Sequence, residues 1–189
     1  MGAGIIPFSV KGGKVWFLFQ RTFEGRKVGY LIDFGGGGGD GETYRQTAVR
    51  EFIEETETMY FSSDIKTAMR SEQSVQAQIP LLDALFERTL TEHPDWWCQR
   101  DPGNKVPPKD WRTFFVEVEY RDLDGMNYEW EIHAGVRFKK RRELVWVQSD
   151  VLYGYYNNEP ERLWKRVRQL MQAKDTIKSI MQHKEDANL

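Results

Sequence analysis

The stretch GGGGGDGETYRQTAVREFIEET, residues 35–56, joins five consecutive glycines to a segment that ends in a cluster of glutamates. At 100° per residue, Glu51, Glu54 and Glu55 fall on one arc of a helix. The apolar residues of the segment fall on the opposite side: Ala48, Val49, Phe52 and Ile53. The spacing therefore predicts a helix over residues 43–56 with one core face and one carboxylate face.

The carboxylate face is costly for an isolated helix. Like charges three or four residues apart each cost about 0.2–0.5 kcal/mol, and the helix dipole disfavours anions in the last turn. One interpretation is a solvated acidic face; another is an oxygen-ligand site for Mg²⁺ or Mn²⁺, where a cation removes the repulsion. The glycines allow the same two interpretations, because they form either a flexible turn or a backbone that can approach a metal and phosphate oxygens.

The spacing of these residues matches a known pattern: glycine, five residues, glutamate, seven residues, then Arg-Glu-apolar-any-Glu-Glu. It resembles the box of the Nudix hydrolases, with the fixed positions filled by Gly36, Glu42, Arg50, Glu51, Glu54 and Glu55. The resemblance covers Gly36 to Thr58. Two positions depart from it, because Glu57 and Thr58 stand where the family has a glycine and an apolar residue.

The resemblance implies a metal-dependent hydrolase that cleaves the diphosphate of a nucleoside diphosphate linked to another group. It implies Mg²⁺, with Mn²⁺ as a substitute, held by Glu51, Glu54, Glu55 and the carbonyl of Gly36. Arg50 and Glu42 are then expected to orient the glutamates. The general base is expected to be Glu51 or a glutamate from a later loop, for which the candidates are Glu129, Glu131 and Glu143.

Two other functions stay open at this point. If position 57 is left-handed, a glutamate there costs on the order of 1 kcal/mol, which favours a catalytically weak nucleotide-binding or regulatory module. The basic run Lys139–Arg142 suggests an RNA-directed, cap-like pyrophosphohydrolase. The markers by which the resemblance would identify an ADP-ribose or a dinucleoside polyphosphate substrate are missing from Glu72–Val75, so the sequence does not select the leaving group.

The order of elements predicts an α/β (α+β) class with a mixed sheet, and the resemblance implies an α/β/α sandwich with an additional C-terminal helix. With 189 residues, of which 40% are hydrophobic, we expect a single domain over residues 1–189. Strands are expected at 5–10, 15–21, 28–34, 112–120 and 143–148, and less clearly at 130–138. The segment 64–89 suggests one or two helices.

Two segments lie outside this core pattern. Residues 91–110 carry four prolines and are expected to be a long irregular insertion. Residues 159–184 have the spacing of an amphipathic helix, whose apolar stripe is expected to pack on the domain or on a partner in a homodimer.

Composition limits the partners and the location. The chain has 27 lysines and arginines against 29 acidic residues, so its net charge of −2 gives no electrostatic reason to expect nucleic acid or membrane as a partner. A small-molecule nucleotide is expected instead. The single cysteine, the missing signal peptide and the absence of an apolar run of about 20 residues predict a soluble cytoplasmic protein.

Overall fold

Six strands form one mixed sheet in the computed structural model, which describes residues 1–185. The strands follow the order β4-β5-β1-β2-β6, and β3 pairs with β1 outside this row. Only β1 and β5 run parallel; the other pairs are antiparallel. The strands are β1 (Gly2–Lys11), β2 (Lys14–Thr22), β3 (Phe34–Gly37), β4 (Trp97–Gln99), β5 (Trp111–Glu117) and β6 (Arg142–Gln148). The predicted mixed sheet is confirmed.

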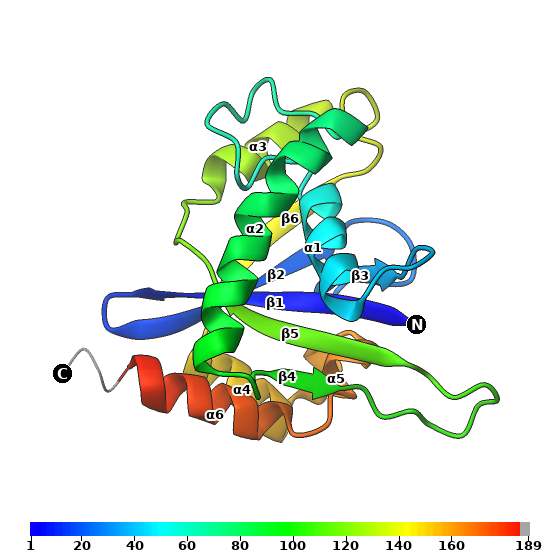
Figure 1. Ribbon diagram of the computed structural model, residues 1–189. Coiled ribbons are helices and arrows are strands. Elements are labelled where there is room, and N and C mark those ends of the chain that lie inside the picture. The colour runs from blue at the N-terminus through cyan, green and yellow to red at the C-terminus, as the bar shows by residue number, and fades with distance from the viewer. Residues whose placement is uncertain (186–189) are drawn as a thin grey trace.

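Helices cover both faces of this sheet (Figure 1). One face carries α1 (Tyr44–Glu55), α2 (Glu72–Glu92) and α3 (Asp124–His133), which share a buried apolar cluster with the sheet. The other face carries α4 (Ser149–Asn158), α5 (Lys165–Arg168) and α6 (Ala173–Lys184), around a second cluster. This is the expected α/β/α arrangement. Within residues 1–185, no helix is both long and apolar enough to cross a membrane.

The central strand β1 contributes side chains to both cores, because successive side chains of a strand point to opposite faces of the sheet. Ala3 and Ile5 belong to the cluster under α1, whereas Ile6 and Phe8 belong to the cluster under α6. Strands β1 and β2, at the positions of two expected strands, pair as an antiparallel hairpin. Its turn places Gly12 and Gly13 at φ of 62° and 76°, a region that glycine adopts without strain.

The glycine run forms strand β3 where the sequence suggested a turn. Strand β3 begins at Phe34, so the strand expected at 28–34 is wrong apart from Phe34 itself and two isolated bridges, Ile32 with Gln20 and Leu31 with Leu163. The physical reason is close approach: a Cβ at Gly35 would lie 2.5 Å from the Ala3 carbonyl oxygen. Residues without side chains let β3 lie against β1 at this distance.

Two further expectations are corrected on the α1 side of the sheet. The tentative strand at 130–138 is wrong, because residues 130–133 end α3, which buries Trp130 in the core, and residues 134–138 form a turn closed by an isolated bridge between Ala134 and Phe138. The insertion expected over 91–110 contains the edge strand β4, whose Cys98 pairs with Thr113 of β5. Residues 91 and 92 complete α2, so the irregular parts are residues 93–96, before β4, and residues 100–110, after it.

The helix expected over 159–184 is broken into a 3₁₀ turn at Pro160–Arg162, the short α5 and the longer α6. The breaks occur where the backbone bonds to distant strands: the Trp164 amide donates to the Leu31 carbonyl, and the Met171 amide donates to the Gln99 carbonyl. Gln172 then turns left-handed, with φ of 62°. Tertiary hydrogen bonds therefore override the helical spacing here.

Cys98 is buried in the second core, where its Sγ lies 3.4 Å from the Thr176 hydroxyl. Burial, with a smaller contribution from the charge of Asp175, raises the pKa of the thiol to about 11. An unfolded thiol has a pKa of about 8.5. The neutral thiol is therefore favoured in the folded chain, and its stabilising contribution is lost as the pH rises from about 8.5 to about 11.

We expect the folded protein at pH 8 to react with a thiol reagent far more slowly than the urea-unfolded chain, because about one thiol in a thousand is ionised at a pKa of 11. The reaction is followed by absorbance with Ellman's reagent. Equal rates in the folded and unfolded chains would contradict the burial of Cys98.

Candidate active site

Helix α1 begins with a capping box, which confirms the helix predicted over 43–56. The Thr43 side chain accepts from the Gln46 amide, and the Gln46 side chain accepts from the Thr43 amide. The predicted core face is buried: Ala48, Val49, Phe52 and Ile53. The helix thus fixes which side the glutamates face.

Arg50 holds the acidic cluster together. Its guanidinium donates to both carboxylate oxygens of Glu42, at 2.9 Å each. The remaining N–H groups donate to Glu51 at 2.9 Å, to Glu54 at 3.3 Å and to the Gly37 carbonyl at 3.1 Å. These contacts raise the pKa of Arg50 further and, through the hydrogen bond from Arg50, lower the pKa of Glu42. Arg50 thus joins Glu42, in the loop before α1, to two glutamates of the helix.

Glu51 lies directly against the glycine strand. A Cβ at Gly36 would meet the Glu51 carboxyl carbon at 2.6 Å, so any other residue there would push this carboxylate away from the strand. Burial raises the pKa of Glu51, and the negative charges of Glu55 and Glu54 raise it further. The like-charge crowding expected from the sequence is therefore present at this carboxyl group.

Glu55 faces the sheet. It accepts from the Gly35 amide at 2.6 Å, from the Gln20 side chain at 3.1 Å and from Arg142 at 3.2 Å. Glu54 accepts from Arg70 at 2.8 Å as well as from Arg50. Arginines thus contact all three glutamates. The local pattern did not single out Gln20 or Arg70; the only hint of Gln20 was a polar residue in the apolar strand 15–21.

The three glutamates lie on one side of α1 and are only 14–18% exposed, but their oxygens do not converge on one point. Among residues 1–185, no three histidine, cysteine or acidic side chains are grouped so that they could hold a metal ion. The donor chemistry nevertheless suits Mg²⁺, because the cluster offers only oxygen donors and Gly36 brings backbone beside Glu51. A cation would have to displace arginine contacts.

The three late glutamates occupy different environments. Glu129 is buried on α3, where it binds Arg137 at 3.1 Å and His133 at 3.2 Å. Glu131 and Glu143 line one cavity of about 310 Å³ together with Arg142. One residue that lines this cavity, Arg142, also contacts Glu55 of the acidic cluster, whereas the carboxylate of Glu129 is engaged by the half-buried Arg137.

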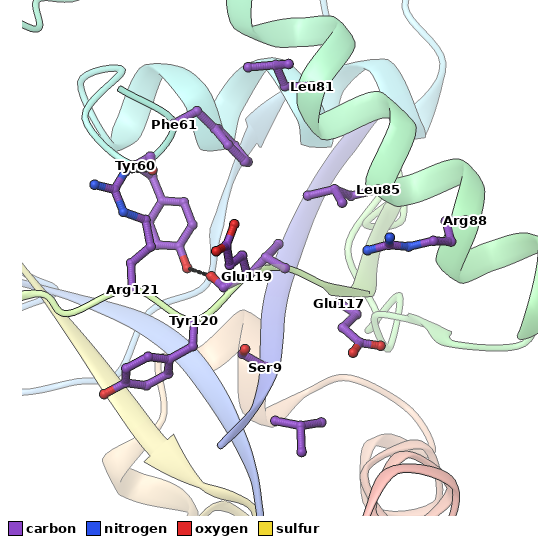
Figure 2. A pocket seen from close by; sticks show the side chains of 12 residues that line it. Ser9, Tyr60, Phe61, Leu81, Leu85, Arg88, Glu117, Glu119, Tyr120 and Arg121 are labelled. Carbon is purple, nitrogen blue, oxygen red and sulfur yellow. Dashed lines mark hydrogen bonds between the residues drawn. The ribbon is translucent and has the colours of Figure 1, made fainter. Parts of the chain in front are cut away.

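The largest cavity lies elsewhere. Figure 2 shows it between α2 and the segments that carry Tyr60 and Tyr120, with Leu85 and Arg88 projecting from the helix. Its volume is about 1060 Å³, and none of the predicted site residues lines it. A smaller cavity of about 440 Å³ lies beside Glu42 and Arg50.

The helix exit carries the two departures from the box. Glu57 and Thr58 are both left-handed, with φ of 55° and 59°, so the expected strain at position 57 is present. Their amides donate to the carbonyls of Glu54 and Ile53, which closes the end of α1. Glu57 is 8% exposed, and burial raises the pKa of its carboxyl group.

Comparisons with known proteins support the fold. An Ap4A hydrolase of C. elegans, solved as a binary complex, superposes with a TM-score of 0.50 over the full length of both chains at 12% identity. A Nudix hydrolase of Alicyclobacillus acidocaldarius also gives 0.50, over 96% of this chain and 90% of that chain at 11% identity. The chain therefore has the Nudix fold.

Sequence comparison gives a match to only part of the chain. No family model matches the chain. Protein L534 of Acanthamoeba polyphaga mimivirus is 42% identical over 62 residues, which is 31% of this chain and 20% of that protein. The match thus spans about a fifth of the relative's length.

We expect Glu57→Gly to stabilise the protein by about 1 kcal/mol, because glycine adopts the left-handed conformation without strain and the buried carboxyl group is removed. Glu57→Ala is the matched control, since it removes the carboxyl group but keeps the Cβ. The free energy of unfolding in urea is measured. A glycine variant no more stable than the alanine variant would show that backbone strain at position 57 is absent.

Proposed function

We propose that this chain is a Nudix hydrolase that cleaves the diphosphate bond of a nucleoside diphosphate linked to another group, using Mg²⁺ or Mn²⁺. The observation that carries the proposal is the Arg50 cluster on a Nudix fold. One guanidinium is fixed on both oxygens of Glu42 and reaches Glu51 and Glu54, while Glu51 lies against Gly36.

The metal ligands in this proposal are Glu51, Glu54, Glu55 and the Gly36 carbonyl. When bound, the cation neutralises diphosphate charge and lowers the pKa of the attacking water. Arg50 and Glu42 orient the carboxylates. Glu51 is the first candidate for the general base, and in the metal-free chain burial and the neighbouring glutamates raise its pKa. Glu143 and Glu131 remain alternative bases, because Arg142, which lines their cavity, contacts Glu55.

A second candidate is a nucleotide-binding module without catalysis. It is favoured by the arginine contacts to all three glutamates, which a cation would have to displace. The substrate of either candidate is a small nucleotide; the Ap4A hydrolase with the same fold suggests including dinucleoside polyphosphates among those tested.

The test is turnover of a substrate panel with Mg²⁺, Mn²⁺ or a chelator. The panel contains nucleotide sugars, NADH, ADP-ribose, dinucleoside polyphosphates and capped RNA. We expect metal-dependent release of a nucleotide product from at least one of them, and a fall in kcat of about 10²-fold or more in Glu54→Gln, because a metal ligand is lost. Glu159→Gln is the control, since within residues 1–185 the Glu159 carboxylate pairs only with Arg162, at the surface.

Nucleotide binding without turnover, unchanged by Glu54→Gln in calorimetry, would favour the binding module. Absence of both turnover and binding across the panel would reject the hydrolase.

Glu51→Gln tests the electrostatic cost of the site separately. The folded pKa of Glu51 is raised, so its ionisation destabilises the fold as the pH rises above the unfolded value of about 4.3. In metal-free buffer we therefore expect the variant to gain thermal stability relative to wild type between pH 4 and pH 7, by a few tenths of a kcal/mol. A difference in Tm between Glu51→Gln and wild type that does not change with pH would contradict the like-charge repulsion at Glu51.

A further inference from the structure

Arg166 of α5 reaches from the far side of the sheet to the glycine strand. Its guanidinium donates to the Asp33 carboxylate at 2.5 Å, to the Asp33 carbonyl at 3.3 Å and to the Gly35 carbonyl at 3.4 Å. It also lies over the Trp111 ring, at 4.5 Å from the centroid. Arg166 is 8% exposed and Asp33 is fully buried.

Two short paths join this ion pair to Glu55. In the first, Arg166 binds the Gly35 carbonyl while the Gly35 amide donates to Glu55 at 2.6 Å. In the second, the Gln20 amide group donates to both the Asp33 carbonyl, at 3.0 Å, and Glu55, at 3.1 Å. One carboxylate oxygen of Glu55 therefore accepts from the amide of Gly35, and Arg166 binds the carbonyl of this same residue. The other oxygen accepts from Gln20, which also donates to the Asp33 carbonyl that Arg166 binds.

The Asp33 carboxylate is also fixed from its other side. Its second oxygen accepts from the Thr113 hydroxyl at 3.2 Å, and Thr113 in turn accepts from the Trp111 indole at 2.8 Å. A buried ion pair of this kind contributes little to net stability, since the desolvation of both charges offsets their attraction. Its contribution is geometric, because a planar guanidinium can hold several acceptors in fixed directions.

We propose that Arg166 is a positioning residue, which aligns the Gly35 amide and Gln20 so that Glu55 faces the site in one orientation. The inference rests on the proposed function for its catalytic consequence. It also gives the C-terminal segment a role in the site. Helix α5 contributes no side chain to the acidic cluster, but its Arg166 binds strand β3, which lies against the cluster.

The test is Arg166→Lys, which keeps the positive charge beside Asp33 but lacks the fork that binds the Asp33 carboxylate through Nε and the Asp33 and Gly35 carbonyls through Nη2. Arg100→Lys is the matched control. Arg100 is a comparably buried arginine that tethers the same segment, and among the described residues its side chain donates only to Gln169, at 2.9 and 3.1 Å.

Three readouts apply to each variant: hydrogen exchange of the Gly35 amide by NMR, the dissociation constant for Mn²⁺ by EPR, and kcat with KM. For Arg166→Lys we expect Gly35 exchange at least tenfold faster, Mn²⁺ affinity about tenfold weaker and kcat lowered more than KM is raised. Arg100→Lys is expected to stay within twofold of wild type. If Arg166→Lys does not fold, Asp33→Asn with Arg166→Gln removes both charges and carries the same expectation.

Gly35 exchange and Mn²⁺ affinity in Arg166→Lys equal to those of Arg100→Lys would overturn the positioning role. A wild-type protein without turnover would instead reject the proposed hydrolase. In that case, Gly35 exchange alone still decides the inference, since it reports the hydrogen bond to Glu55 without any reaction.

Discussion

The acidic cluster depends on the ion pairs of one arginine. Glu42, Glu51 and Glu54 are brought within reach of one another, and their mutual repulsion would open the cluster if Arg50 did not donate to all three. Two of the contacts go to Glu42, which anchors the guanidinium to the loop before α1. The loop, the helix and the glycine strand are therefore coupled through one charged group.

The glycine strand β3 brings backbone groups close to the carboxylates of Glu51 and Glu55. Gly35 lies against β1 and Gly36 against Glu51 at distances that a Cβ would prevent. The Gly35 amide is thereby free to bind Glu55 at 2.6 Å. Arg142 and Arg166, from segments distant in sequence, complete the surroundings of this strand. A site built from one local motif is thus held by three remote regions.

Local sequence predicted the helix well because its determinants are local. The capping residues at 43 and 46, the apolar stripe and the carboxylate arc all lie within residues 43–56, and the structure places them as the spacing requires. The same reasoning failed at 130–138 and at 159–184. There the outcome depends on which surface buries Trp130, and on the distant carbonyls of Leu31 and Gln99 that receive the amides of Trp164 and Met171.

The sequence by itself determined the α/β class through the order of its elements, and the box helix with its carboxylate face through the spacing of residues 43–56. The grouping of Arg50 and Glu42 with these glutamates was expected only from the resemblance to the Nudix box, and in the structure Arg50 contacts Glu42. The tertiary structure alone decided that the glycines form a strand and that Gln20, Arg142 and Arg166 surround Glu55. The reason is physical: hydrogen bonds between segments 35 to 131 residues apart depend on the packing of both faces of the sheet, which no local pattern records.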